Sequence, residues 1–134
     1  MTTHATGTFD VTLTPQGPPE QSEGIAVGRM TVDKQFHGDL EGTSKVQMLT
    51  AAADSTGAGA YVAIERVTGT LHGRRGSFVL MHSGTRTPDG QHLTVTVAPG
   101  LGTGQLAGLA GTMTISVVDK QHRYALDYTL PPAR

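Results

Sequence analysis

The chain has 134 residues, enough for one domain with its own core, so we expect residues 1–134 to form a single domain. It has no cysteine, which excludes disulfides and thiolate metal sites. The net charge is −1 without blocks of like charge, and no apolar run approaches the ~20 residues of a membrane span, so we expect neither nucleic-acid nor membrane binding.

Strict alternation of polar and apolar residues is the main structural signal. In Thr6–Thr14 every even position is polar, whereas Phe9, Val11 and Leu13 share the other face, as in a half-buried strand. The abundance of glycine, 18 residues, fits strands joined by tight turns. We predict strands at Thr6–Thr14, Ile25–Asp33, Leu40–Thr50, Tyr61–Thr70, Ser77–Thr85, Gln91–Val97, Thr112–Val118 and Gln121–Leu130.

Turn-rich segments separate these strands. Links this short favour antiparallel neighbours, and eight such strands close naturally into a barrel. The fold class predicted is therefore all-β, a single eight-stranded antiparallel up-and-down β-barrel of the calycin-like kind. Val46–Ala53 has some helical character, and we interpret it as the end of a strand. The predicted turns and loops are Pro15–Pro19, Phe36–Asp39, Asp54–Gly57, Gly73-Arg74, Thr87–Gly90 and the glycine-rich Pro99–Gly111, a flexible loop that would close one mouth of the barrel as a lid.

The register of one hairpin can be predicted to the residue. Gly73-Arg74 suits a two-residue type II′ turn, in which glycine takes the first central position. Small residues on the inward face, Ala63, Gly69 and Gly84, would leave room inside the barrel. The register pairs inward-facing residues, namely Gly69 with Phe78, Val67 with Leu80, and Glu65 with His82.

The outward face of the same hairpin is unusually apolar. Val62, Ile64, Val79 and Met81 lie on it beside a few polar residues. Either a loop or terminus covers this face, or it is a subunit interface of a homo-oligomer.

The last two strands follow the same logic. A turn at Asp119-Lys120 would place Ile115 opposite Tyr124 and Met113 opposite Leu126. Tyr124, Leu126, Tyr128 and Leu130 alternate along one face, which we expect to point inward.

Several motifs resemble a bacterial family known as a domain of unknown function. They are Gly59–Glu65, Gly69–Gly84, the loop Pro99–Gly111 and the closing Tyr124–Tyr128. In the loop, this chain has Leu101 at the position where the family pattern Ser-Gly-Thr-Gly has serine. This family is similar in fold to the plant allene oxide cyclases, which are eight-stranded barrels with a ligand cavity. The resemblance implies a barrel and no activity, because the cyclases use an asparagine-held water and this chain has no asparagine.

Glu65 and His82 form the candidate catalytic pair. A carboxylate that holds an imidazole can fix its tautomer and raise its basicity, as general acid–base catalysis requires, and Tyr61 on the same face would add a phenolic donor. The alternative is a buried polar pair that only stabilises the register.

Other cofactor motifs are weak, so we predict no cofactor and no metal. The six histidines show no ligand spacing. Gly102–Ala107 matches a dinucleotide fingerprint, but a strand rather than a helix follows it.

These observations leave three functions open. The first is a barrel that binds a small, partly apolar molecule; the second is an isomerase or cyclase using Glu65 and His82; the third is a structural or assembly module with a filled core. We expect a cytoplasmic protein, because Met1–His4 lacks a signal-peptide pattern. The residues predicted to contact a ligand are Tyr61, Phe78, Leu80, Met113, Tyr124, Leu126 and Tyr128.

Overall fold

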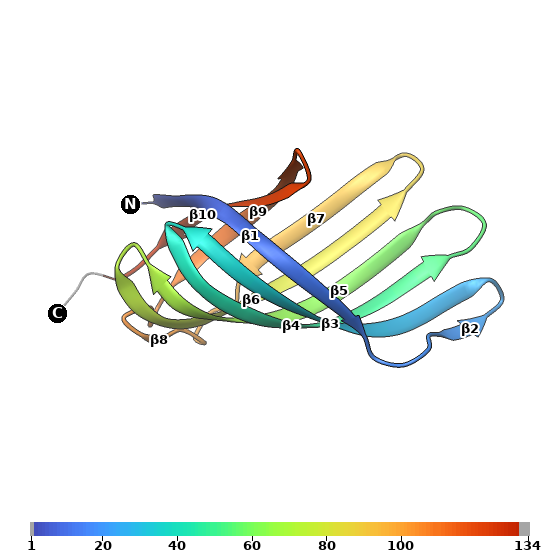
Figure 1. The fold of residues 1–134 in the computed structure, drawn as a ribbon, viewed down its shortest axis with the longest axis horizontal. Coiled ribbons are helices and arrows are strands. Elements are labelled where there is room, and N and C mark those ends of the chain that lie inside the picture. The colour runs from blue at the N-terminus through green and yellow to red at the C-terminus, as the bar shows by residue number, and fades with distance from the viewer. Residues whose placement is uncertain (1, 132–134) are drawn as a thin grey trace.

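The computed structural model describes residues 2–131, which form ten strands and a closed sheet (Figure 1). Eight strands make an antiparallel barrel, because β1 pairs with both β10 and β3. The all-β barrel predicted from alternation is therefore confirmed. Residues 2–131 contain no helix long and apolar enough to cross a bilayer. The strands are β1 (Thr3–Pro15), β2 (Glu20–Ser22), β3 (Ile25–Gly38), β4 (Leu40–Ala53), β5 (Gly59–Leu71), β6 (Arg74–Thr87), β7 (Gly90–Val97), β8 (Thr103–Gly104), β9 (Ala110–Val118) and β10 (Gln121–Thr129).

Most strands are longer than alternation predicted. Strand β3 runs on through Phe36 and His37, where the sequence predicts a turn, because both residues pair with β1. Strand β4 continues to Ala53, so the segment with helical character is strand, as expected. Two short strands, β2 and β8, were not predicted; β2 pairs with β3 and β8 with β6.

The β5–β6 turn differs from the prediction by one residue. Its central residues are His72 and Gly73, with φ of 47° and 80°, and Leu71 pairs with Arg74. Positive φ at both positions is the type I′ turn, the commonest two-residue hairpin turn. The register therefore shifts by two residues relative to the prediction. Because side chains alternate with a period of two, the inward face is unchanged. The observed partners are Val67 with Phe78, Glu65 with Leu80, and Ala63 with His82.

The β9–β10 turn agrees with the prediction. Asp119 and Lys120 both have positive φ, and Ile115 pairs with Tyr124 as expected. Met113 pairs with Leu126 in the same register.

The inward glycines do not leave the room that we expected. A Cβ on Gly69 would lie 2.2 Å from the carbonyl oxygen of Glu41, because β4 and β5 approach closely there. At Gly84 the space is filled by the ring of its partner Tyr61, 2.5 Å from the Cβ position. Covering a strand glycine with an aromatic ring is thus a feature of Tyr61 and Gly84, whereas Gly69, which the predicted register placed opposite Phe78, pairs with Gly76.

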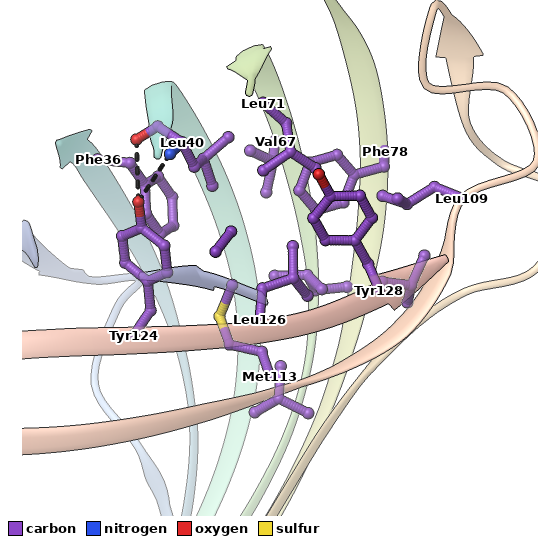
Figure 2. Close-up of a cluster of buried hydrophobic side chains, with 14 of the residues drawn as sticks. Phe36, Leu40, Val67, Leu71, Phe78, Leu109, Met113, Tyr124, Leu126 and Tyr128 are labelled. Carbon is purple, nitrogen blue, oxygen red and sulfur yellow. Dashed lines mark hydrogen bonds between the residues drawn. The ribbon is translucent and has the colours of Figure 1, made fainter. Parts of the chain in front are cut away.

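One half of the barrel interior is filled with apolar side chains (Figure 2). The Tyr124 hydroxyl accepts a hydrogen bond from Leu40 N (2.8 Å) and lies 3.2 Å from the Leu40 carbonyl oxygen, which joins β10 to the β3–β4 turn. The glycine-rich loop closes this end as a packed plug and not as a lid, since Leu106 and Leu109 are buried in the same cluster. We call this the closed half.

The other half remains open. The hairpin turns of β2–β3, β4–β5, β6–β7 and β9–β10 project on the side away from the plug (Figure 1). Strands β7 and β9 share only two paired positions, Val95 with Met113 and Thr96 with Thr112, so the sheet is weakly joined there. Leu93 and Val117 lie beyond that junction, and Leu13 lies beyond Phe9, the last β1 residue that pairs with β10. All three stay 45–60% exposed although their alternation places them on the inner face. We call this the open half.

Candidate functional site

A layer of four polar side chains lies between the closed and open halves. It comprises Lys34 on β3, Ser44 on β4, Glu65 on β5 and His82 on β6, one residue from each of four adjacent strands. Along β3, Lys34 stands between the apolar inward residues Val32 and Phe36, which belong to two different hydrophobic clusters. The layer therefore separates the packed core of the closed half from the smaller apolar cluster on the side of the open half, which contains Val32, Val46 and Ala63.

Glu65 is the centre of this polar layer. Its side chain is fully buried, and Oε1 accepts hydrogen bonds from His82 Nε2 (2.7 Å) and Lys34 Nζ (3.1 Å). Its second oxygen, Oε2, accepts from Ser44 Oγ at 2.5 Å. Lys34 Nζ also lies 4.8 Å from the centre of the Phe9 ring, a favourable cation–π distance. The buried carboxylate is thus held by three donors.

The environment of Glu65 keeps it ionised. Burial raises its pKa, but the His82 hydrogen bond, the charge of Lys34 and the Ser44 hydrogen bond together outweigh burial and lower the pKa below its ordinary value. Because an ionised carboxylate only accepts hydrogen bonds, His82 must donate from Nε2. A neutral His82 then carries its free lone pair on Nδ1.

Tyr61 connects this layer to the open half. Its hydroxyl lies 3.4 Å from His82 Nδ1, so the contacts form a chain from Tyr61 through His82 to Glu65. Burial and the negative charge of Glu65 raise the pKa of Tyr61, which keeps the phenol protonated and able to donate. The same Tyr61 side chain lines a hollow of about 360 Å³ together with Met48, Gly84 and Leu93.

The predicted site residues are divided between two places. Glu65, His82 and Tyr61 lie together at the boundary of the two halves, in contact although Glu65 and His82 are diagonal rather than directly opposed. The other six pack against one another in the closed half, at most 4% exposed (Figure 2). These six are Phe78, Leu80, Met113, Tyr124, Leu126 and Tyr128.

Sequence reasoning missed Lys34 and Ser44. Both stand on the inward face of an alternating segment: Lys34 between Val32 and Phe36, and Ser44 two residues before Val46. The signal was present in the alternation, but the predicted strand ended at Asp33 and so excluded Lys34. Lysine at an inward position would have indicated a buried carboxylate partner.

The described residues offer no obvious metal centre. Between positions 2 and 131, no three histidine, aspartate or glutamate side chains gather closely enough to hold an ion. Four histidines instead each pair with a single carboxylate, as His37 does with Asp10 at 3.2 Å.

Comparison with known proteins identifies the family but no activity. The family model described as "Protein of unknown function (DUF3224)" matches residues 5–128. No curated protein matches the chain. The crystal structure of a DUF3224-family protein of unknown function from Shewanella oneidensis MR-1, at 1.84 Å resolution, is 44% identical; the alignment covers 98% of this chain and 100% of that chain, with a TM-score of 0.91. Since the family model spans nearly the whole barrel, the chain belongs to the DUF3224 family.

Proposed function

We propose that the protein binds a small, partly apolar molecule in the open half of its barrel, with Tyr61 as the polar contact. The observation that carries this proposal is the hollow of about 360 Å³, into which Met48 and Leu93 expose apolar surface beside Tyr61. Ligand sites commonly combine an apolar wall with a few polar groups, and this volume falls within their usual range. Such an architecture would also be similar to that of the plant allene oxide cyclases.

The unfilled interior supports binding over a purely structural role. Leu13 and Val117 remain 56% and 60% exposed on the inner face, at a cost in free energy that an apolar guest would offset. A structural barrel would gain stability by filling this space, as the closed half does.

The contacts of Tyr61 indicate the chemistry of the ligand. The phenol has one proton, and its contact with His82 Nδ1 is long at 3.4 Å, so Tyr61 can turn that proton to an oxygen acceptor on the ligand, such as a carbonyl or carboxylate. The ligand would therefore carry one oxygen acceptor at the end that enters the barrel and apolar carbons at the end that remains near Leu93.

Binding of anilinonaphthalene sulfonate, an amphipathic fluorescent anion, tests this proposal. We expect Leu93→Asp to abolish the fluorescence increase and Tyr61→Phe to raise the Kd about three- to tenfold, the value of one hydrogen bond. Ile64→Asp is the matched control, because Ile64 is exposed to a similar degree (53% against 45%) but lies on the outer face and does not line the hollow. If Leu93→Asp bound the probe as well as the wild type did, the proposal would be wrong.

A second candidate is the isomerase or cyclase that uses Glu65 and His82. The chain of contacts from Tyr61 through His82 Nδ1 to Glu65 favours it, because it resembles an acid backed by an oriented base. Tyr61 would donate its proton to a substrate carbonyl oxygen while His82 Nδ1 takes a proton from the adjacent carbon. His82 would then return that proton to another carbon of the enol, and the enol O–H proton would go back to Tyr61.

Deuterium incorporation tests this second function. With 2-cyclohexenone in D₂O, we expect exchange above the buffer rate, measured by NMR, and loss of that excess in His82→Gln. Retained probe binding together with unaltered exchange in His82→Gln would leave binding as the function and rule out the acid–base role.

A further inference from the structure

A polar hollow of about 590 Å³ lies on the outside of the closed half, where the glycine-rich loop meets the sheet. Strand β8 of this loop pairs with β6 and places Thr103 opposite Ser77. The close approach requires glycine at position 76, because a Cβ there would lie 2.2 Å from the Thr103 carbonyl oxygen. We call this site the outer hollow, and its polar lining consists of Arg66, Thr68, Arg75, Ser77 and Thr103.

The strand register sets the two arginines at opposite ends of the outer hollow. On β6, Arg75, Ser77 and Val79 alternate on the outer face, and Arg66 of β5 is opposite Val79. Thr68 is opposite Ser77 in the middle. Each arginine therefore lies about 7 Å along the strands from the Thr68–Ser77 pair, one on either side. Because an arginine side chain is of similar length, both guanidinium groups can reach an anion that lies above this pair.

The hydroxyl groups between the arginines have a donor to spare. Thr103 Oγ1 accepts a hydrogen bond from Ser77 N (3.1 Å) and lies 2.6 Å from Ser77 Oγ. The two hydroxyls carry two protons, and only one of these lies between the two oxygens, so the other can be donated to a bound molecule. The guanidinium group of arginine also has donors and no acceptor. The outer hollow is therefore rich in donors, as a site for an oxygen-bearing anion would be.

Positive charge is in excess at the outer hollow. Within residues 2–131, neither guanidinium has a carboxylate oxygen within ion-pair distance. The neighbour of Arg66 on β4 is another cation, Lys45, which itself lies opposite Asp33 of β3. Glu41 lies two strands from Arg75, and its carboxylate accepts a hydrogen bond from a backbone N–H at the end of β3 (2.9 Å). The nearest acidic residues thus lie outside the hollow, on β3 and β4.

We propose that the outer hollow binds a small phosphate monoester whose organic group is apolar. A phosphate presents oxygens on several sides, so it can accept from Arg66, Arg75 and the hydroxyls between them at once, whereas a planar carboxylate accepts mainly in one plane. Two apolar side chains that line the hollow, Val79 and the 53% exposed Leu101, would cover the organic group. This site is separate from the hollow beside Tyr61, because the two share no lining residue.

Titration with phenyl phosphate, followed by amide NMR spectra of the whole chain, tests the site. We expect saturable shifts of the Ser77 and Thr103 amide signals, and Arg66→Gln and Arg75→Gln should each raise the Kd about fivefold. Arg123→Gln is the matched control, because Arg123 is exposed on β10 and does not line the hollow, so the Kd should stay unchanged. Absence of shifts at both amides, or an unchanged Kd in either arginine variant, would overturn the proposal.

Related probes test each part of the ligand. Inorganic phosphate should shift the same amides with a Kd about threefold higher, and Leu101→Ser should remove this advantage of the phenyl group. Benzoate should bind at least about fivefold more weakly than phenyl phosphate. Benzoate binding as tight as that of phenyl phosphate would overturn the choice of a phosphate. A Kd for phenyl phosphate that rises in Tyr61→Phe would place the probe in the open half and overturn the site.

Discussion

The closed and open halves of the barrel share one sequence pattern but reach different states. Phe78 and Leu93 both occupy inward positions on neighbouring strands, yet Phe78 is 1% exposed and Leu93 is 45% exposed. Strand parity therefore decides which way a side chain points, and closure of the sheet decides whether it is buried. The short pairing between β7 and β9 leaves the sheet poorly closed in the open half, so Leu93 points inward but is not buried.

The two halves therefore differ in what they can contribute to the protein. Stability resides in the closed half, where aromatic rings and the plug loop exclude water. The open half tolerates exposed apolar surface, which a binding site requires and a core avoids. The buried Glu65 layer lies where the two halves meet, so it contributes to both.

The largest expected effect is on the packing of the closed half. Phe78→Ala should lower the free energy of unfolding by about 3–5 kcal/mol, because it leaves a cavity in a filled core. Leu93→Ala should change it by less than about 1 kcal/mol, since the side chain is already near solvent. Urea unfolding followed by circular dichroism measures both. Equal losses in the two variants would mean that the halves do not differ in packing.

Removal of the central charge should have a similar but slightly smaller effect. Glu65→Gln leaves Lys34 buried without its counter-charge, which typically costs about 3 kcal/mol. The same unfolding measurement applies, with the exposed Glu20→Gln as a control that should stay within about 0.5 kcal/mol of the wild type. A neutral result for Glu65→Gln would show that the layer is not held by its charge.

The tyrosine that links β10 to the β3–β4 turn should matter less. In Tyr124→Phe the buried Leu40 N loses its acceptor, for an expected loss of about 1–3 kcal/mol. Hydrogen exchange at the Leu40 amide reports the broken bond directly. Unchanged protection of that amide would contradict the prediction.

The smallest effect is the pH dependence that Glu65 contributes. Its folded-state pKa is lowered, so its stabilisation is complete above the ordinary glutamate pKa of about 4.3 and is lost as the pH falls through the folded value. Unfolding free energies measured on both sides of that pKa should fall more steeply toward acid for the wild type than for Glu65→Gln. Parallel curves would mean that Glu65 titrates normally.

Much of the fold follows from local features of the chain. Alternation located eight strands, and the Asp119-Lys120 turn set the register of β9 and β10 correctly. At the β5–β6 turn, the glycine allows either Gly73-Arg74 or His72-Gly73 as the two central residues. The sequence favours the first, but the structure has the second, with a positive φ at His72. The resulting error of two residues kept Glu65 and His82 on the inward face, which is why the candidate pair was still found.

The amino-acid sequence by itself determined the all-β class and the inward direction of Glu65, His82 and Tyr61, because a period of two is a local property of the chain. Only the tertiary structure decided that Lys34 and Ser44 join Glu65, and that Val62 and Ile64 stay exposed on the outer face of the described chain. It also decided that the interior is filled at one end and hollow at the other. These outcomes depend on closure between β1 and β3 and on the short junction of β7 with β9, pairings between distant segments that no local pattern encodes.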